Sequence, residues 1–199
     1  MQFGVYLCGA VTAIQQKLME SAPNLRPLVR TALFTALTIV GAYISLPIGE
    51  VPIVLSDFVV MLAGLLLGRG WAPLSVGIYL LLGAVGLPVF AGGAGGIQAF
   101  YGPTGGYLFG FLVSSWLVSS IAQGKTQWYW HLAALVAGSA VIFTLGVAWL
   151  QYKLGLTLAQ ALAAGFLPFI PFNVVKMLVA TALARQLQPL IYPTSSARL

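Results

Sequence analysis

A lysine and an asparagine lie three residues apart in an apolar segment near the C-terminus. Lys176 and Asn173 belong to the run FNVVKMLVA. A buried ammonium in a membrane helix costs roughly 3 kcal/mol on insertion scales, so it persists where it has a partner. The sequence holds three acids, Glu20, Glu50 and Asp57, and we therefore expect a ligand to bring the negative charge. The spacing places Asn173 and Lys176 on one helix face, where they could hold a molecule with an amide-like group and a carboxylate.

Simpler roles for these two residues remain open at this point. Lys176 could snorkel, with its stem in lipid and its ammonium at the interface. Asn173 could hydrogen-bond to another helix of a bundle. Pro168 and Pro171 suit the first turn of the helix, whose N-terminus favours an anion through its dipole and free N–H groups.

The uncharged, glycine-rich segment 86–107 is the second candidate region. Its glycines allow the backbone to approach a ligand closely. Phe90 and Tyr101 can cover an apolar ring, and Gln98 and Thr104 add polar groups. The segment lacks the Gly-Lys-Ser/Thr ending of a phosphate-binding loop. A flexible linker is the alternative, but that reading does not explain the interleaved aromatic residues and prolines.

The composition indicates a membrane protein. Of the 199 residues, 60% are hydrophobic and 6% are charged, and the mean hydropathy is +0.98. A soluble domain of this size could not bury so much apolar surface. The net charge of +6 comes from dispersed residues, which indicates orientation in a membrane and not nucleic-acid binding. Cys8 is the one cysteine, which excludes an intrachain disulfide and a cysteine metal site.

Six apolar segments predict an all-α integral membrane protein with six transmembrane helices. The segments are 30–46, 55–67, 72–87, 105–121, 131–152 and 169–187. The second is shorter than the roughly 20 residues of a straight span, so we expect a steep helix or an extension of covered non-helical backbone. Residues 28–188 would form the membrane domain and 189–199 a tail. The extension 1–27 suits a short interfacial helix or a disordered tail better than a signal peptide.

The distribution of basic residues predicts that both termini are cytoplasmic. With that orientation the inner side carries Lys17, Arg26, Arg30, Arg69, Lys125, Arg185 and Arg198, and Lys153 alone lies in an outer loop. Lys176 then lies about four residues, or ~6 Å, below the outer end of the last helix. It is therefore within reach of a ligand that arrives from outside.

Several motifs together resemble the BioY family of biotin transporters, which are the S components of energy-coupling factor (ECF) transporters. The matching stretches are 47–55, 62–68, 79–93, 102–107 and 167–176. The resemblance extends over about 28–188. It implies an ECF S-component-like six-helix bundle in the bacterial plasma membrane and biotin capture on the outer side. It also implies coupling to a T component and two ATPases, which use ATP.

The resemblance implies roles for individual residues as well. The last-helix motif of the family usually reads Pro-Gly-Asp-x-x-Lys, with the acid and the lysine in the biotin site. Lys176 matches the lysine, whereas Asn173 stands at the acid position. Asp57 could supply the missing acid from another helix, although capping that helix is a simpler role. The Ala-xxx-Ala strip that docks on the T component maps to Ala32 and Ala36, but another helix of the same bundle could also pack there.

The predicted function is high-affinity biotin binding by an S component. Lys176 would pair with the valerate carboxylate and Asn173 would contact the ureido group, or the reverse if biotin binds the other way round. Phe90 and Tyr101 would enclose the rings, and the loop 86–106 would act as the gate. No Walker motif is present, so ATP hydrolysis is assigned to partner subunits.

Two other classes of function were weighed. A stand-alone secondary transporter of biotin or a related small carboxylate would need a coupling-ion site, and Asp57 is the sole candidate acid. An intramembrane enzyme is not indicated, because the sequence has no paired acids, zinc-ligand spacing or Gly-x-Ser-x-Gly elbow. The single histidine, His131, is expected at the cytoplasmic interface. No cofactor or metal is predicted.

Overall fold

The computed structural model describes residues 25–47 and 49–191. Most of the predicted N-terminal extension and the last part of the predicted tail, residues 192–199, lie outside the described residues. The final helix continues to Ile191, beyond the expected end of the membrane domain at 188.

Each of the six apolar segments coincides with a helix. The helices are α2 (Arg26–Tyr43), α3 (Ser56–Leu66), α4 (Trp71–Ala84), α6 (Gly105–Ala122), α7 (Trp128–Leu154) and α9 (Ile170–Ile191). Within the described residues, three helical stretches are long and apolar enough to cross a membrane: α6, α7 and the run Leu158–Ile191 that ends with α9. α3 and α4 are apolar but shorter. The chain is thus an all-α membrane protein whose helices are unequal in length, and the count of six spans stays a prediction.

Short elements that the apolar pattern did not predict complete the fold. They are the strands β1 (Ser45–Leu46) and β2 (Ile53–Val54), the turns η1 (Ala91–Gly93) and η2 (Leu167–Phe169), and the helices α5 (Gln98–Tyr101) and α8 (Leu158–Gly165). A capping box at Thr157 and Gln160 starts α8, because each side chain accepts a backbone N–H of the other residue.

The antiparallel pair β1–β2 leads directly into the short helix α3. The N–H of Leu55 donates to the carbonyl oxygens of Gly41 and Ile44, at 3.1 and 3.0 Å. Val51 and Ile53 are buried beneath the pair. Irregular backbone in a membrane needs protein cover and internal hydrogen bonds, and this segment has both.

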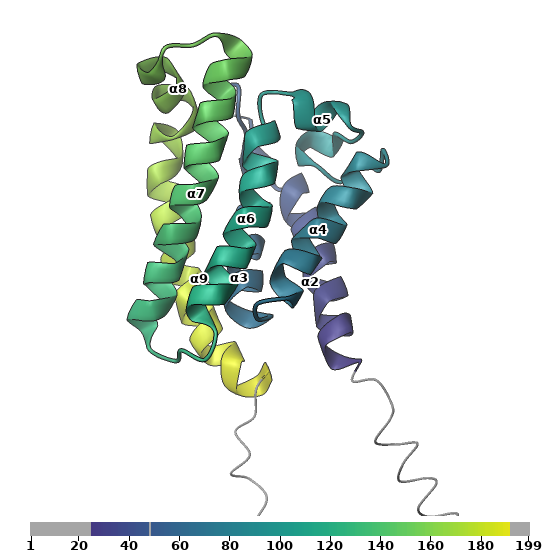
Figure 1. Cartoon of the computed structure of the whole chain (residues 1–199), viewed down its shortest axis with the longest axis vertical. Coiled ribbons are helices and arrows are strands. Elements are labelled where there is room, and N and C mark those ends of the chain that lie inside the picture. The colour runs from purple at the N-terminus through teal and green to yellow at the C-terminus, as the bar shows by residue number, and fades with distance from the viewer. Residues whose placement is uncertain (1–24, 48, 192–199) are drawn as a thin grey trace, which may run out of the picture.

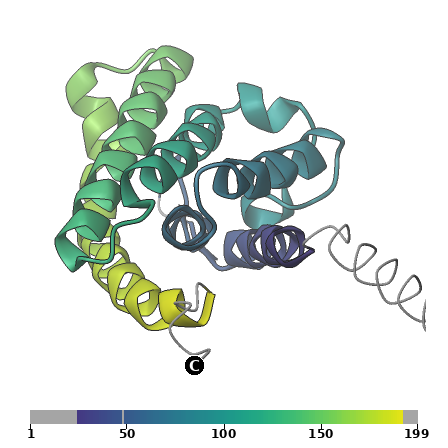
Figure 2. The ribbon, with the colours of Figure 1, turned by 60° about the horizontal axis from the view of Figure 1, so that its bottom comes forward.

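The helices form one bundle with distinct ends (Figure 1). α6 packs along α7 in the most extensive helix–helix contact, and α3 contacts α2, α4, α6, α7 and α9. α7, α8 and α9 lie on one side of the bundle and α2 and α4 on the other (Figure 2). The start of α2 and the end of α9 are at the lower end in Figure 1, while α5 and α8 are at the upper end. Both termini of the bundle therefore emerge on the same side.

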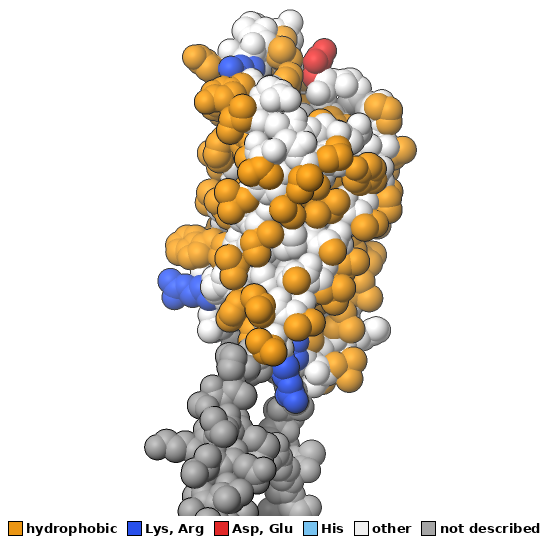
Figure 3. Space-filling view, turned by 90° about the vertical axis from the view of Figure 1, so that its right-hand side faces the viewer, with side chains coloured by type: hydrophobic (Ala, Val, Ile, Leu, Met, Phe, Trp, Pro, Cys, Tyr) orange, Lys and Arg blue, Asp and Glu red, His pale blue; other side chains and the backbone are white. Residues whose placement is uncertain are grey.

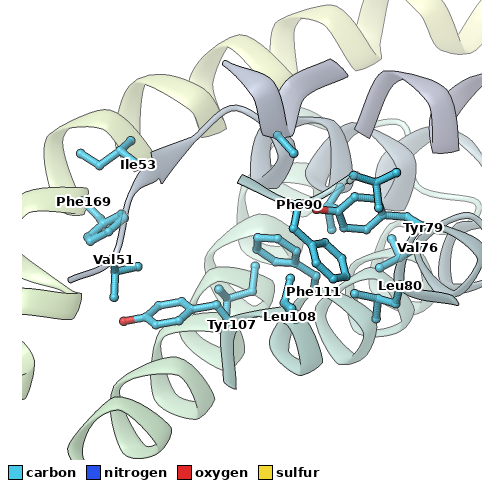
Figure 4. Close-up of a cluster of buried hydrophobic side chains, with 14 of the residues drawn as sticks. Val51, Ile53, Val76, Tyr79, Leu80, Phe90, Tyr107, Leu108, Phe111 and Phe169 are labelled. Atoms are coloured by element: carbon cyan, nitrogen blue, oxygen red, sulfur yellow. The ribbon is translucent and has the colours of Figure 1, made fainter. Parts of the chain in front are cut away.

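Two apolar clusters fill the interior. The cluster nearer the upper end is rich in aromatic residues, including Tyr79, Phe90, Tyr107, Phe111 and Phe169 (Figure 4). The cluster nearer the lower end is mostly aliphatic and joins α3, α6, α7 and α9. Glycine permits the closest helix approach: a Cβ at Gly110 of α6 would lie 2.9 Å from the Cα of Ile142 in α7.

The outer surface is apolar as well (Figure 3). Large hydrophobic side chains on α2, α4, α7 and α9 are exposed, and the charged side chains visible in this view lie toward the two ends. Such a surface is unfavourable in water but matches the hydrocarbon core of a bilayer.

Candidate functional site

The upper end of the bundle contains a cavity of about 270 Å³. It lies among the segment before α3, the helices α4, α6 and α7, the loop that contains η1 and α5, and η2. Its lining is formed by Val51, Pro52, Val54, Ser56, Asp57, Tyr79, Phe90, Ala91, Ala94, Ala99, Gly102, Thr104, Tyr107, Leu108, Phe111, Ile142, Phe143 and Phe169. Small-molecule sites are typically ~300–1,000 Å³, mostly apolar, with a few polar groups that set orientation. The cavity fits the lower end of that description and suits a compact ligand.

Phe90 forms one wall of the cavity, and its contact with a bound ring stays a prediction. Its side chain is 4% exposed and meets the rings of Tyr79 and Phe100 edge-to-face, with centroids 5.3 and 5.6 Å apart. Figure 4 shows Phe90 and Tyr79 side by side. The Phe90 ring lies against the bare backbone of Gly83, where any Cβ would overlap it. The Phe90 ring can therefore occupy this position only because residue 83 of α4 is a glycine.

The loop between α4 and α6 is packed against the bundle. The Tyr43 hydroxyl donates to the carbonyl of Pro88, and the N–H of Gly96 donates to the carbonyl of Gly83 at 2.7 Å. The indole N–H of Trp149 donates to the carbonyl of Gly102 at 3.0 Å. These bonds fix both arms of the loop, so the structure differs from a free linker. A gating movement of this loop stays a prediction.

Tyr107 supports the opposite part of the lining. Its hydroxyl donates to the carbonyl of Gly165 at 2.8 Å, and its ring stacks on Phe169 with centroids 6.4 Å apart. Gly165 ends α8 and Phe169 ends η2. One side chain of α6 therefore holds the corner through which the chain enters α9.

A buried ion pair joins the start of α3 to α9. The ammonium of Lys176 donates to both carboxylate oxygens of Asp57, at 2.7 Å to Oδ1 and 3.0 Å to Oδ2. It also donates to the carbonyl of Val54 at 2.6 Å. The two side chains are only 12% and 15% exposed. A buried ammonium is tolerated when it is paired and fully hydrogen-bonded, and both conditions hold here.

This pairing revises the expected environment of Lys176. The sequence favoured a ligand as the source of negative charge, but Asp57 supplies it from within the chain. The ammonium turns inward to Asp57 and Val54, so it does not snorkel to the interface. Asp57 also accepts the N–H of Phe58 at 2.8 Å and so serves the first turn of α3 as well.

Asn173 is buried one turn before Lys176. Its side chain is 9% exposed, and its Oδ1 has no hydrogen-bond partner among the described residues. Within the described chain, neither Asn173 nor Lys176 forms part of the cavity lining, which Asp57 does reach. The structure thus brings Asp57 and Phe90 to one cavity and pairs Asp57 with Lys176, while Asn173 lies outside the lining among the described residues.

Tyr101 and Gln98 lie away from the cavity lining in the described residues. Tyr101 is 65% exposed, and the ammonium of Lys153 lies 5.8 Å from its ring centroid. The exposed side chain of Gln98 donates to the carbonyl of Gly95 at 2.9 Å. Their assignment to a lid over the ligand stays a prediction.

Ala32 and Ala36 are exposed on the outer face of α2. None of the described helices covers them, in contrast to the alternative that another helix of the bundle packs on this strip. The strip is therefore open to a partner or to lipid.

The interior position of His131 also differs from expectation. The sequence placed it at an interface, but the side chain is fully buried, and its Nε2 lies 3.0 Å from the carbonyl oxygen of Lys125. Among the described residues, no group of three or more His, Cys, Asp or Glu side chains could hold a metal.

Tyr79, Tyr107 and Phe169 line the cavity, although they were not among the predicted site residues. In an apolar helix, the sequence does not show whether an aromatic residue faces lipid, the protein core or a ligand. The signal that was available is glycine: Gly83 and Gly146 lie where the rings of Phe90 and Tyr107 approach the backbone.

Comparison with known proteins matches this arrangement to one family. The BioY family model matches residues 13–192. The biotin transporter BioY of Thermotoga maritima is 43% identical over 166 residues, covering 83% of this chain and 98% of that protein. The probable biotin transporter BioY of Pyrococcus horikoshii is 44% identical over 157 residues, with 79% and 93% covered.

A solved structure resembles the fold as well. It is the 2.1 Å crystal structure of the S-component for biotin from an ECF-type ABC transporter, with a TM-score of 0.79 and 31% identity. The match covers 84% of this chain and 93% of the solved chain. With motifs, family model and fold in agreement, the chain belongs to the BioY family.

Proposed function

We propose that this chain is the biotin-binding S component of an ECF-type transporter. The observation that carries the proposal is the apolar, aromatic-walled cavity with one buried ion pair at its edge, in a bundle similar to the solved biotin S-component. The relatives are named as transporters, so the chain is a transport protein and not an enzyme.

The cavity suits the chemistry of biotin. The fused rings are compact and largely apolar, and Phe90, Tyr79 and Tyr107 offer large aromatic surfaces at low entropic cost. The ureido group and the carboxylate need polar partners, and Asp57 lies in the lining, paired with Lys176. Tyr101 and Gln98 enter the proposal as lid residues that would meet the ligand after a movement of the loop.

Transport needs further subunits. We assign energy coupling to ATPase subunits and a T component, and we place T-component docking at Ala32 and Ala36, which are exposed on α2. Both termini of the bundle emerge at one end (Figure 1), and the basic residues favour a cytoplasmic location for that end in the bacterial plasma membrane.

The stand-alone transporter gains no support from the site. A coupling ion needs a carboxylate that is free to bind it. The charge of Asp57, the candidate for that role, is already balanced by the ammonium of Lys176 at 2.7 Å, so a coupling cation would have to compete with it. We therefore propose a single function.

Calorimetric titration of the purified protein with biotin, desthiobiotin and thiamine tests the proposal. We expect tight binding of biotin, weaker binding of desthiobiotin, which keeps the ureido ring but lacks sulfur, and no binding of thiamine. Thermal unfolding without ligand serves as the control for folding. A cooperatively folded sample that does not bind biotin would refute the assigned substrate.

A further inference from the structure

We infer that Asp57 is the charged group that receives the ligand, through the ureido N–H groups, and that Lys176 is a positioning residue that holds Asp57. The inference rests on the proposed biotin function and deepens it by assigning the orientation of the ligand. It departs from the expectation that Lys176 binds the valerate carboxylate.

The hydrogen-bonding capacity of Lys176 is already used. A lysine ammonium has three donors and no acceptor. In the structure the three donors reach Asp57 Oδ1 at 2.7 Å, Asp57 Oδ2 at 3.0 Å and the carbonyl of Val54 at 2.6 Å. A ligand carboxylate could bind the ammonium only by displacing one of these partners.

Asp57 has hydrogen-bonding capacity left, and it lines the cavity. Its Oδ1 accepts from Lys176 and from the N–H of Phe58, whereas Oδ2 accepts from Lys176 alone among the described residues. An ionised carboxylate offers about four acceptor sites in all. Asp57 lines the cavity, and it is the one charged residue of the described chain that does so. The free acceptor therefore points to a ligand that offers donors.

The two ends of biotin differ in what they offer. The ureido ring carries two N–H donors, while the valerate end is a negatively charged acceptor. A second carboxylate beside Asp57 in an apolar cavity would be repelled, because charges interact strongly where water is excluded. The ureido end is the complementary partner of Asp57, and the valerate end lies away from it.

Lys176 allows Asp57 to bind the ureido group as a charged carboxylate. An isolated carboxylate in an apolar site is strongly disfavoured, and a hydrogen-bonded cation keeps it ionised. Lys176 also links Asp57 to Val54, which lines the cavity as well. It thereby fixes the carboxylate relative to the segment that precedes α3.

The Asp57→Asn variant separates the two ligand orientations by the sign of its effect. If Asp57 accepts the ureido N–H groups, we expect biotin to bind ~10–100-fold more weakly, since a hydrogen bond to a charged group is replaced by one to an amide. If Lys176 were the carboxylate receptor, its release from Asp57 would tighten biotin binding. Tighter binding by a folded Asp57→Asn protein would overturn the inference.

A double variant guards against misfolding and against a lysine that finds a new partner. Asp57→Asn/Lys176→Met removes both charges, which is better tolerated than leaving one buried charge unpaired. This double variant is titrated with biotin and with biotinamide, in which a neutral carboxamide replaces the carboxylate. The results are compared with those of the wild type. We expect both ligands to weaken by the same factor, so the ratio of their Kd values stays within about threefold of the wild-type ratio.

The alternative predicts a different ratio. If Lys176 holds the valerate carboxylate, the wild type discriminates against biotinamide, and that discrimination disappears in the double variant. A ratio that collapses to about one would overturn the inference while leaving biotin as the ligand. By contrast, a wild-type protein that binds neither compound would refute the proposed function itself.

Discussion

The cavity and the outer face of α2 use apolar residues in opposite ways. At the cavity, aromatic side chains are buried, and Lys176 pairs with Asp57 of the same chain. On α2 the buried side carries Thr31, Thr35 and Thr38, and the exposed side carries leucines, valines and the alanine strip. The Thr35 hydroxyl, for example, donates to the carbonyl of Ser75 at 3.0 Å. The buried side of α2 thus combines hydroxyl groups with Phe34 and Ala42, whereas its exposed side is apolar.

This difference separates two functions. The cavity is completed by residues of its own chain, so ligand binding should not depend on another subunit. The outer face of α2 is left uncovered, so its role depends on what packs against it. Substitutions in one region should therefore leave the function of the other intact, and the following predictions test that separation.

The largest effect is expected from bulky residues on the open strip. Ala32→Trp/Ala36→Trp should abolish biotin uptake in cells that express the whole transporter, because indole rings prevent close helix approach. Binding to the purified S component should stay within about twofold of the wild type, as for other surface changes. Uptake of labelled biotin and calorimetry measure the two effects.

A matched control for the strip lies on α7. Ala133 and Ala140 are exposed on that helix. Ala133→Trp/Ala140→Trp should retain uptake, since those positions are not in the proposed docking strip. If the α2 variant lost biotin binding as well as uptake, the docking role would be contradicted. The α2 strip would then also be needed for ligand binding.

The second prediction addresses the aromatic wall. Gly83→Ala places a methyl group where the Phe90 ring lies, so the ring must move toward the cavity or the loop. Overpacking of this kind costs ~1–3 kcal/mol, and we expect at least a tenfold loss of biotin affinity if the moved ring occupies ligand space. Calorimetry and thermal unfolding distinguish lost affinity from lost stability.

Gly77 provides the control on the same helix. The nearest atom to a Cβ at Gly77 is Leu112 Cδ1 at 4.0 Å, an ordinary contact. Gly77→Ala should bind biotin like the wild type and gain up to about 1 kcal/mol of helix stability. Equal behaviour of the two alanine variants would argue against a fixed Phe90 wall.

The two regions were not equally accessible to sequence reasoning. The exposed strip follows from local spacing, and the helices follow from apolar runs such as 131–152. The partner of Lys176 could not be derived in the same way. Asp57 is separated from it by 119 positions, and both a ligand and a capping role were consistent with the sequence. Long-range pairing depends on how helices pack, which apolar composition leaves undetermined.

Short elements were missed for a related physical reason. α8 is held by a local capping box and by the Tyr107 bond, and the β1–β2 pair is held by backbone hydrogen bonds. Neither feature has the length that makes a hydropathy pattern informative. The motifs of the family, by contrast, identified the function without these details.

The third prediction concerns Tyr107, which anchors the corner before α9. Tyr107→Phe removes the hydroxyl and leaves the buried carbonyl of Gly165 without this donor, which costs ~1–3 kcal/mol. We expect a lower unfolding temperature and a severalfold loss of affinity. Tyr152→Phe, at an exposed tyrosine, is the control and should change neither quantity. Unchanged stability of Tyr107→Phe would mean that the corner is held by ring stacking alone.

The smallest effect is expected at Tyr101, at the boundary between the cavity and the open surface. Its exposed ring lies outside the lining, whereas Phe90 forms part of it. With the loop as the structure has it, Tyr101→Ala should weaken biotin binding by no more than about twofold, whereas Phe90→Ala should weaken it much more, because it removes one wall of the cavity. Calorimetry on both variants measures the contrast. A loss above tenfold for Tyr101→Ala would mean that the loop closes over bound biotin and brings this exposed ring into the site.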